Sequence, residues 1–180
     1  MTAHGSCILR RVSEPTDPAE IVRASLASAE AAPRRLRQLW HGLPDRDCVR
    51  KPGVGKLSLA EHLWHLRDME RDVFGARMRR VLAEDDPRLE PLDVEEHEDR
   101  DLEGSAETLA DVVASWEAER RANVALVEST TPEQWQRPLH HPLIGRARFL
   151  DLVRRWGRHD AEHLRQIEIL ARNCRERNLP

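Results

Sequence analysis

Two histidines four residues apart, His159 and His163, are the residues whose types and spacing most clearly suggest chemistry. In a helix these positions lie one turn apart on the same face, so both imidazoles would point the same way. The surrounding apolar residues predict a helix whose buried face passes through both histidines. They are Phe149, Leu152, Val153, Trp156, Ile167 and Leu170. Two such imidazoles can bind one metal ion; the alternative is a pair of core histidines that are hydrogen-bonded to polar neighbours.

A second pair of histidines, His62 and His65, lies three residues apart in another stretch with helical periodicity. His62 is nearer the centre of that apolar face, and His65 lies further round the helix. Either side chain can reach a helix packed alongside. Periodicity therefore leaves both residues open as a third ligand.

Other polar side chains near these histidines are candidates for supporting roles. Asp68 and Asp160 can fix the tautomer of a ligand histidine, with an ordinary surface carboxylate as the alternative. Arg120 interrupts the apolar face of a third helix. Its guanidinium can meet an anionic substrate or extend to water at the edge of the bundle, and we favour the latter. His97 is interpreted as a solvated loop histidine, and Cys48 as a thiol that no neighbour activates.

Four long helices are predicted to position these residues. The first covers about 18–40, the second follows a cap at residue 58 and ends near 83, the third follows a cap at Ser105 and includes 109–127, and the fourth covers about 147–174. Asp17 caps the first helix, and Ser58 with Glu61 forms a capping box. Pro33 is expected to kink or break the first helix, because it removes a backbone donor and clashes with the preceding turn.

The connections between these helices differ in length and charge. Residues 84–104 contain 11 Asp or Glu against Arg88 and Arg100, and about twenty residues is long for a bundle connection. Residues 41–56 and 137–145 are predicted loops, and 131–135 a short turn. No stretch alternates as a β-strand does. We therefore predict an all-α four-helix bundle at 17–175, with a long acidic loop between helices two and three and a flexible arm at 1–16.

Composition excludes several classes of protein. The chain has 180 residues, 34% of them charged, and a net charge of -3, which argues against a nucleic-acid binder. Three cysteines far apart argue against a disulfide framework. No apolar stretch approaches the ~20 residues of a membrane span, and the N-terminus lacks the apolar core of a signal peptide. We expect a cytoplasmic protein that does not contact a membrane.

Three segments resemble those of DinB/YfiT-like proteins. GKLSLAEHLWHLRDME at 55–70 is similar to the family's second-helix signature, and HDAEHLRQIEIL at 159–170 to its last-helix signature. HPLIGRARFLDL at 141–152 resembles the usual lead into that last helix. Leu57 departs from the aromatic residue that usually precedes the serine of the second-helix signature, which concerns packing more than ligation.

This resemblance covers about 18–174 and implies a four-helix bundle, commonly a homodimer, with a divalent metal held by three histidines. Carried over residue by residue, the ligands are His65, His159 and His163, and His62 is their neighbour. Imidazole ligands suit zinc or nickel. Three protein ligands leave a coordination position open, as catalytic sites do.

Three functions follow as hypotheses. Some relatives are transferases or isomerases that use a low-molecular-weight thiol such as bacillithiol or mycothiol. The resemblance thus implies thiol transfer to an electrophilic small molecule, with Arg120 available for a substrate carboxylate. The same site suits metal-dependent hydrolysis, for which Glu61 and Asp68 are the candidate general bases. The third hypothesis is a stress or interaction protein without catalytic activity.

Overall fold

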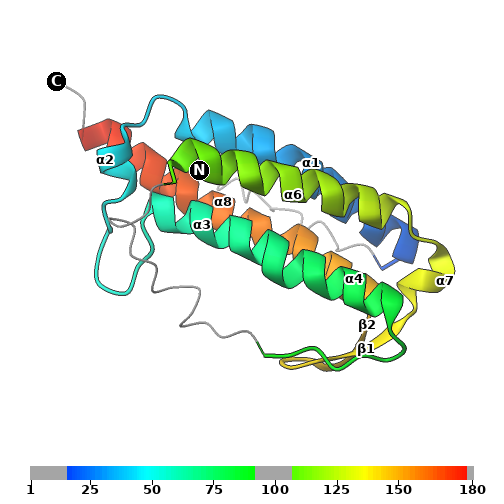
Figure 1. The fold of residues 1–180 in the computed structure, drawn as a ribbon. Coiled ribbons are helices and arrows are strands. Elements are labelled where there is room, and N and C mark those ends of the chain that lie inside the picture. Colours follow the sequence, from blue (N-terminus) through cyan, green and yellow to red (C-terminus); the bar gives the residue numbers. More distant parts are fainter. Residues whose placement is uncertain (1–15, 92–106, 178–180) are drawn as a thin grey trace, which may run out of the picture.

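The protein is described here from a computed structural model that places residues 16–91 and 107–177. His97, Ser105 and all but the last residue of the expected arm at 1–16 lie outside the described residues. Four long helical segments dominate the described part (Figure 1). They confirm the predicted all-α four-helix bundle.

The first long helix, α1, spans Pro18–Trp40 and begins where the sequence predicts. Asp17 caps it by accepting a hydrogen bond from the backbone N of Glu20 at 3.0 Å. The helix continues through Pro33, so a break there, which was one of the two expected outcomes beside a kink, is wrong. A helix tolerates proline when the carbonyl four residues earlier finds another donor. Here that carbonyl belongs to Ala29 and accepts from Nη1 of Arg120 at 3.2 Å.

The second long helical segment is continuous but not uniform. It comprises α3 (Leu59–Asp68), a π-helical stretch η1 (Met69–Gly75) and α4 (Ala76–Ala83). The predicted Ser58–Glu61 capping box starts it, and it ends at the predicted residue. The π-helical stretch is a finding of the structure, and such insertions are frequent at functional sites.

The remaining long helices are α6 (Leu109–Glu128) and α8 (Phe149–Arg177). A capping box of Thr108 and Asp111 starts α6. The helix therefore begins three residues later than a cap at Ser105 would set it, because Thr108 offers both the side-chain acceptor and the matching acidic partner.

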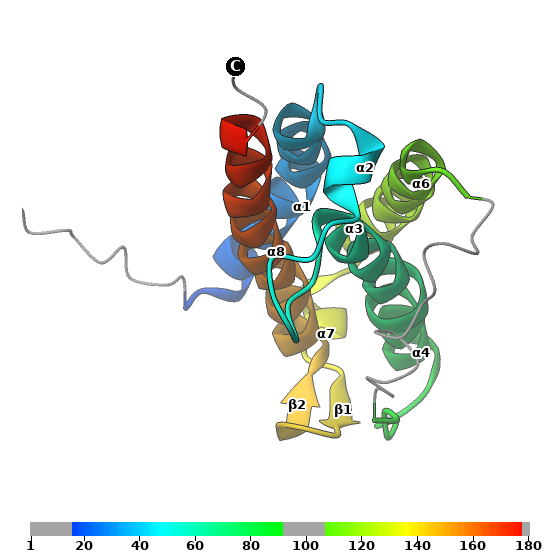
Figure 2. The same ribbon diagram turned by 90° about the vertical axis from the view of Figure 1, so that its left-hand side faces the viewer.

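The helices form a bundle in which α1 and α3 each lie beside both α6 and α8 (Figures 1 and 2). The α3–α4 segment and α6 run in the same direction, whereas α1 and α8 run the opposite way (Figure 1). The end of α4 and the start of α6 therefore lie at opposite ends of the bundle (Figure 1). A helix of 20 residues is about 30 Å long, which explains why this connection is so long.

Shorter elements close the two ends of the bundle. One-turn helices α2 (Asp45–Cys48) and α7 (Pro132–Trp135) follow α1 and α6. The expected loop at 137–145 is wrong, because β1 (Pro138–His141) and β2 (Gly145–Arg148) form an antiparallel hairpin with Leu139 opposite Ala147. Each strand has only four residues, which is the lower limit at which alternation can be recognised. The hairpin leads directly into α8 (Figure 2).

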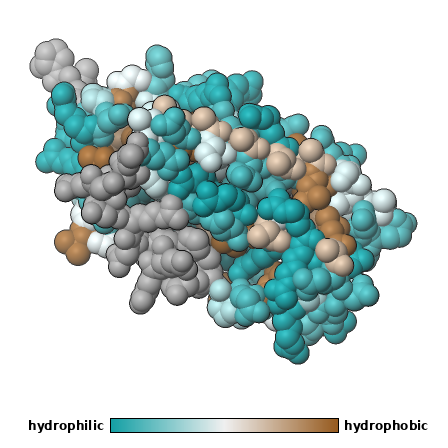
Figure 3. Space-filling model, in the orientation of Figure 1, coloured by the Kyte–Doolittle hydropathy of each residue, from teal (hydrophilic) through white to brown (hydrophobic). Residues whose placement is uncertain are grey.

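Two groups of buried apolar side chains fill the bundle, one around Trp156 and the other around Trp116. Between the groups, buried polar side chains from η1, α6 and α8 lie close together. They are Glu70, Arg120, Asn123 and Asp160. The outer surface in Figure 3 is mostly hydrophilic, with small apolar patches. Within 16–91 and 107–177, no helix is both long and apolar enough to cross a membrane.

Candidate metal centre

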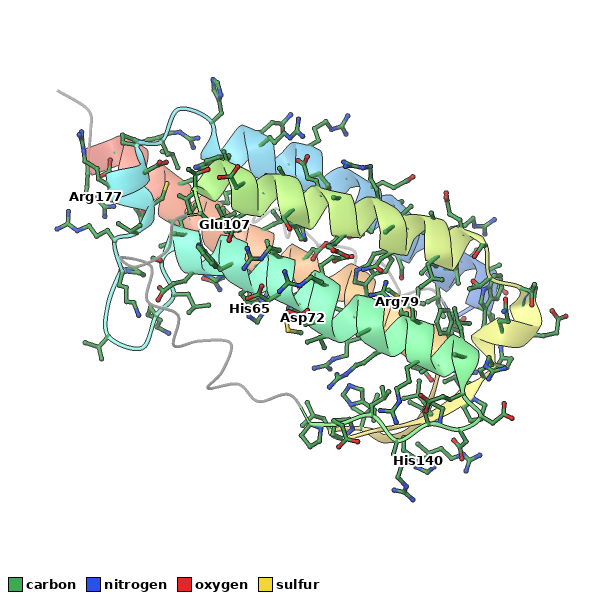
Figure 4. The ribbon with its side chains drawn as sticks, viewed as in Figure 1. His65, Asp72, Arg79, Glu107, His140 and Arg177 are labelled. Carbon is green, nitrogen blue, oxygen red and sulfur yellow. The ribbon has the colours of Figure 1, made fainter. Side chains whose placement is uncertain are left out.

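The structure gathers His65, His159 and His163 into one group. Each offers a nitrogen, and these three atoms lie within 4.8 Å of one another. Nε2 of His65 is 3.2 Å from Nε2 of His159, and the ring of His163 is centred 4.5 and 4.4 Å from those of His65 and His159. His65 projects from α3 near the middle of the bundle (Figure 4). The other two histidines come from adjacent turns of α8, as their spacing predicts.

The chemistry and spacing of these nitrogens fit a divalent metal ion. Two nitrogens bound tetrahedrally to one zinc ion are about 3.4 Å apart, given a bond of about 2.1 Å. The 3.2 Å between the Nε2 atoms of His65 and His159 is close to that value. All three rings are half-buried. Solvent therefore reaches the group only in part, and a small ligand can still approach it from outside. Three imidazoles without a carboxylate suit zinc or nickel.

His62 lies beside the group rather than within it. Its Nδ1 is 3.0 Å from Nδ1 of His163, so one of these nitrogens donates a hydrogen bond to the other. This contact engages Nδ1 of His163 and leaves Nε2 for an ion. Histidine ligands commonly have such a partner, which fixes the tautomer and the ring orientation.

Burial and neighbouring charge keep His163 neutral. Burial, followed by the charges of His159, His65 and His62, lowers the pKa of His163 to about 3. Burial also lowers the pKa of His62. A neutral imidazole is the form that binds metal. His163 is therefore ready for ligation throughout the physiological pH range.

Asp160 connects the histidine group to the buried polar layer. Its Oδ1 lies 3.7 Å from Nδ1 of His159, on the ring edge opposite the nitrogen that faces His65. The other carboxylate oxygen accepts from Nη1 of Arg120. Burial alone would raise the pKa of Asp160, but the charge of Arg120 and the hydrogen bonds from His159 and Arg120 together outweigh it and hold that pKa below its usual range. Asp160 is therefore a buried, ionised carboxylate beside a histidine of the group.

Arg120 is in turn held by Glu70. Nη2 of Arg120 donates to Oε2 of Glu70 at 2.6 Å, and both side chains are at most 2% exposed. The expectation that Arg120 extends to the bundle edge is wrong, because two buried carboxylates and the Ala29 carbonyl hold it in the core. One arginine against two carboxylates leaves one negative charge in this layer. A cation held by the adjacent histidines would balance that charge, which further supports the fit of a metal ion.

The π-helical stretch positions Glu70 within this network. Asn123 donates to the backbone oxygen of Glu70 at 3.0 Å and to its Oε1 at 2.8 Å. Nε1 of Trp156 lies 3.1 and 3.0 Å from the two carboxylate oxygens. A Cβ on Gly75 would lie only 2.7 Å from Oδ1 of Asn123. Glycine is therefore the residue that lets α6 approach the π-helical stretch.

Two carboxylates that the sequence suggested, Asp68 and Glu61, each form an ion pair in the structure. Asp68 is buried and accepts from Nε of Arg67 at 3.0 Å. Glu61 accepts from the backbone N of Ser58 at 2.7 Å and lies 2.8 Å from Nζ of Lys51. Asp68 is therefore part of an ion pair, and Glu61 is part of both an ion pair and the cap of α3.

Cys48 does not have the properties of a reactive thiol. The side chain is fully buried, and burial, then the neighbouring Cys174 and Asp45, raises the pKa of its thiol to about 11. A nucleophilic cysteine needs the opposite shift. The interpretation of Cys48 as an unactivated thiol agrees with this environment.

Sequence reasoning missed Glu70, which was not distinguished from the many surface acids. Its partners Asn123 and Trp156 are 53 and 86 residues away. The sequence held a weak signal for it, because Glu70 lies next to Met69 in a helical segment whose neighbouring side chains are mostly buried. Periodicity also left the choice between His62 and His65 open; the family resemblance implied His65, and the structure places that residue in the group.

The fold and the three histidines define a helical bundle of a kind that can hold a divalent metal ion. The chain belongs to the DinB superfamily, whose family model matches residues 28–167. This range includes all three histidines of the group. The match confirms the family resemblance of the sequence.

Among solved structures, YfiT from Bacillus subtilis is similar, with a TM-score of 0.77 and 19% sequence identity. The similarity covers 89% of this chain and 90% of that chain. YfiT is described as a probable metal-dependent hydrolase with an unusual four-helix bundle topology. At this identity the comparison shows the shared fold. No curated protein matches the chain.

Proposed function

We propose that the protein is a metal-dependent thiol S-transferase, which transfers a low-molecular-weight thiol to an electrophilic small molecule. His65, His159 and His163 hold a divalent ion, zinc or nickel. The observation that carries this proposal is the meeting of three imidazole nitrogens within 4.8 Å, with His159 also in the wall of a pocket. A structural zinc site normally has four protein ligands, whereas three leave a position for a reactant.

A bound divalent ion supplies Lewis acidity, which lowers the pKa of a thiol or a water molecule in the open position. The protein's own residues hold and orient the ligands. His62 fixes the ring of His163 through the 3.0 Å contact between their Nδ1 atoms. Asp160 faces Nδ1 of His159 and supports the tautomer that presents Nε2.

The proposed reaction needs neither an oxidant nor a reductant. The thiol loses its proton, its sulfur forms a bond to the electrophilic carbon, and a leaving group departs with its electron pair. With an unsaturated acid, the adjacent carbon takes up a proton instead. The thiolate is itself the nucleophile, so this chemistry does not depend on a carboxylate base. The engagement of Glu61 and Asp68 in other contacts therefore favours it.

Metal-dependent hydrolysis is a second candidate for the same site. The description of YfiT as a probable metal-dependent hydrolase favours it. It uses the same three histidines and the same open position, with water in place of the thiol. A metal that serves only to stabilise a non-catalytic protein is the remaining hypothesis.

The test begins with metal content, measured by elemental analysis of the untagged protein. We expect about one zinc or nickel ion per chain, and loss of that ion in His159→Ala/His163→Ala. A matched control, His41→Ala/His140→Ala, removes two histidines outside the group and should keep the ion. A protein that binds neither metal after incubation with both would refute the proposed site.

The metal-loaded protein is then assayed in parallel with two panels. One panel combines several low-molecular-weight thiols with halogenated, epoxide and unsaturated-acid electrophiles, and the other contains esters, amides and phosphates. Turnover in the first that disappears in the histidine double variant supports thiol transfer. Turnover in the second alone supports hydrolysis. Turnover in neither, with a normal metal content, favours the non-catalytic hypothesis.

A further inference from the structure

Two buried cysteines meet where the short helix α2 lies against the end of α8 (Figure 1). Cys48 is the last residue of α2, and Cys174 lies in the last turn of α8. Sγ of Cys174 donates to the backbone oxygen of Asp47 at 3.7 Å, although Asp47 and Cys174 are 127 positions apart in the sequence. The fold therefore brings together two thiols that the sequence places far from one another.

The contact with Asp47 sets an upper limit on the distance between the two cysteines. The carbonyl oxygen of Asp47 belongs to the peptide bond that leads to Cys48, and such an oxygen lies about 2.8 Å from the next Cα. Sγ of Cys174 is therefore at most about 6.5 Å from Cα of Cys48. Both side chains also belong to the same apolar group around Trp116. Because a disulfide spans Cα atoms up to about 6.8 Å apart, the two side chains are within reach of such a bond.

The two thiols differ in their surroundings. Cys48 is fully buried, and burial, followed by the charges of Cys174 and Asp45, raises the pKa of its thiol to about 11. Sγ of Cys174 accepts from Nη2 of Arg177 at 3.3 Å. Arg177 is exposed, so this contact lies at the solvent edge of the sulfur. Because a guanidinium beside a sulfur stabilises negative charge that forms on it, Cys174 is the thiol that reacts first and Cys48 the one that follows.

The place of Cys174 in its helix gives a small oxidant access to the sulfur. Helix α8 ends at Arg177, and the last carbonyls of a helix have no donor within it. Such a terminal turn opens more readily than the middle of a helix. Nη2 of Arg175 donates to the backbone oxygen of Leu39 at 2.6 Å and holds the closed turn against α1. Closure after a brief opening therefore returns Cys174 to its place beside α2.

We propose that Cys48 and Cys174 form a site of reversible oxidation, at which hydrogen peroxide converts the two thiols into a disulfide that joins α2 to α8. The sulfur of Cys174 attacks one peroxide oxygen, the O–O bond breaks, and a water molecule leaves a sulfenic acid behind. The sulfur of Cys48 then attacks that sulfur, the S–O bond breaks, and a second water molecule leaves. The two thiols lose two electrons and two protons in total, and the peroxide accepts them.

This site is separate from the candidate metal centre. Neither cysteine belongs to the histidine group, so the inference stands or falls independently of the proposed function. The bond would nevertheless fix the far end of the helix that carries His159 and His163. It would also close a long loop of the chain, which restrains the unfolded state more than the folded state.

The test uses the full-length, metal-free protein with the substitution Cys7→Ser, because Cys7 lies outside the described residues and offers a third thiol. Dilute hydrogen peroxide is added, and the intact chain and its peptides are analysed by mass spectrometry. We expect the loss of two hydrogen atoms, a peptide that joins Cys48 to Cys174, and reversal by dithiothreitol. The melting temperature should rise by about 10 °C on oxidation, because the bond restrains the unfolded chain.

Matched variants in the same background complete the test. Cys48→Ala and Cys174→Ala should show neither the loss of hydrogen nor the rise in melting temperature. Arg177→Gln should slow disulfide formation, whereas Arg172→Gln, at another exposed arginine of α8, should not. Equal rates in these two variants would overturn the assignment of Cys174 as the first thiol.

The folded state must itself bring the thiols together, so the same oxidation is repeated in urea. The unfolded chain should form the bond more slowly, because its cysteines are separated by a long loop. The proposal is overturned if the folded protein keeps both thiols or only gains oxygen, if the melting temperature does not rise, or if the unfolded chain forms the bond equally fast.

Discussion

Nη1 of Arg120 donates a hydrogen bond to the carbonyl oxygen of Ala29 at 3.2 Å. Pro33 follows Ala29 by four residues and has no N–H, so the helix itself leaves this carbonyl without a donor. The same guanidinium is paired with Glu70 and Asp160. One buried arginine therefore compensates for a proline in α1 and pairs with carboxylates from two other helices.

Replacement of Arg120 should consequently be costly. In Arg120→Met two buried carboxylates and a backbone carbonyl lose their partner, and breaking a buried ion pair in this way costs about 3–5 kcal/mol. Urea unfolding followed by circular dichroism measures the change. Arg121→Met, at the adjacent exposed position, is the control and should change stability little. Equal stability of the two variants would show that the buried network contributes nothing net.

Removal of the carboxylate beside His159 should weaken metal binding. Asp160→Asn removes the negative charge that lies 3.7 Å from Nδ1 of His159, and loss of such partners typically costs about 10–100-fold in metal affinity. Competition with a chromophoric chelator measures the zinc affinity. Glu168→Gln, which is also in α8, removes an exposed carboxylate that pairs with Arg35 of α1, and the zinc affinity of this variant should stay unchanged. Unchanged affinity in Asp160→Asn would exclude the supporting role.

An added methyl group at Gly75 tests the close approach of α6 to the π-helical stretch. A Cβ there would lie 2.7 Å from Oδ1 of Asn123 and 2.8 Å from the backbone oxygen of Glu70. Alanine normally stabilises a helix relative to glycine, but this overlap should reverse the sign and cost about 1–3 kcal/mol. Thermal unfolding measures it. Gly53→Ala has open space around the new methyl group and should be tolerated. A more stable Gly75→Ala would contradict the packing described.

Protonation of His163 should make the metal-free protein sensitive to acid. Its pKa is about 3 in the folded state against 6.5 for a free histidine. Above pH 6.5 the group is neutral in both states and has no effect. As the pH falls from 6.5 towards 3, the unfolded chain takes up a proton that the native state does not, so stability decreases. Urea unfolding across this range should show that the free energy of unfolding decreases less in His163→Asn than in His41→Asn. If it decreases equally with pH in both variants, the lowered pKa of His163 is contradicted.

The sequence by itself determined the helices and most of their ends. Asp17, the Ser58–Glu61 pair and the apolar periodicity act over three or four neighbouring residues, so they can be recognised without the fold. The same is true of His159 and His163, which share a helix face whatever packs against it. The family resemblance added His65, and the structure places that residue with the other two.

Only the tertiary structure decided what surrounds these histidines. Glu70 and Arg120 meet across 50 residues of sequence, and Arg120 and Ala29 across 91. Whether Pro33 breaks its helix depends on that distant donor, and whether Arg120 reaches water depends on two carboxylates from other helices. Local patterns carry no information on partners that come together only when the bundle closes. The packing of α6 against the π-helical stretch, and of α3 against α8, therefore decided which polar residues became buried around the candidate metal centre.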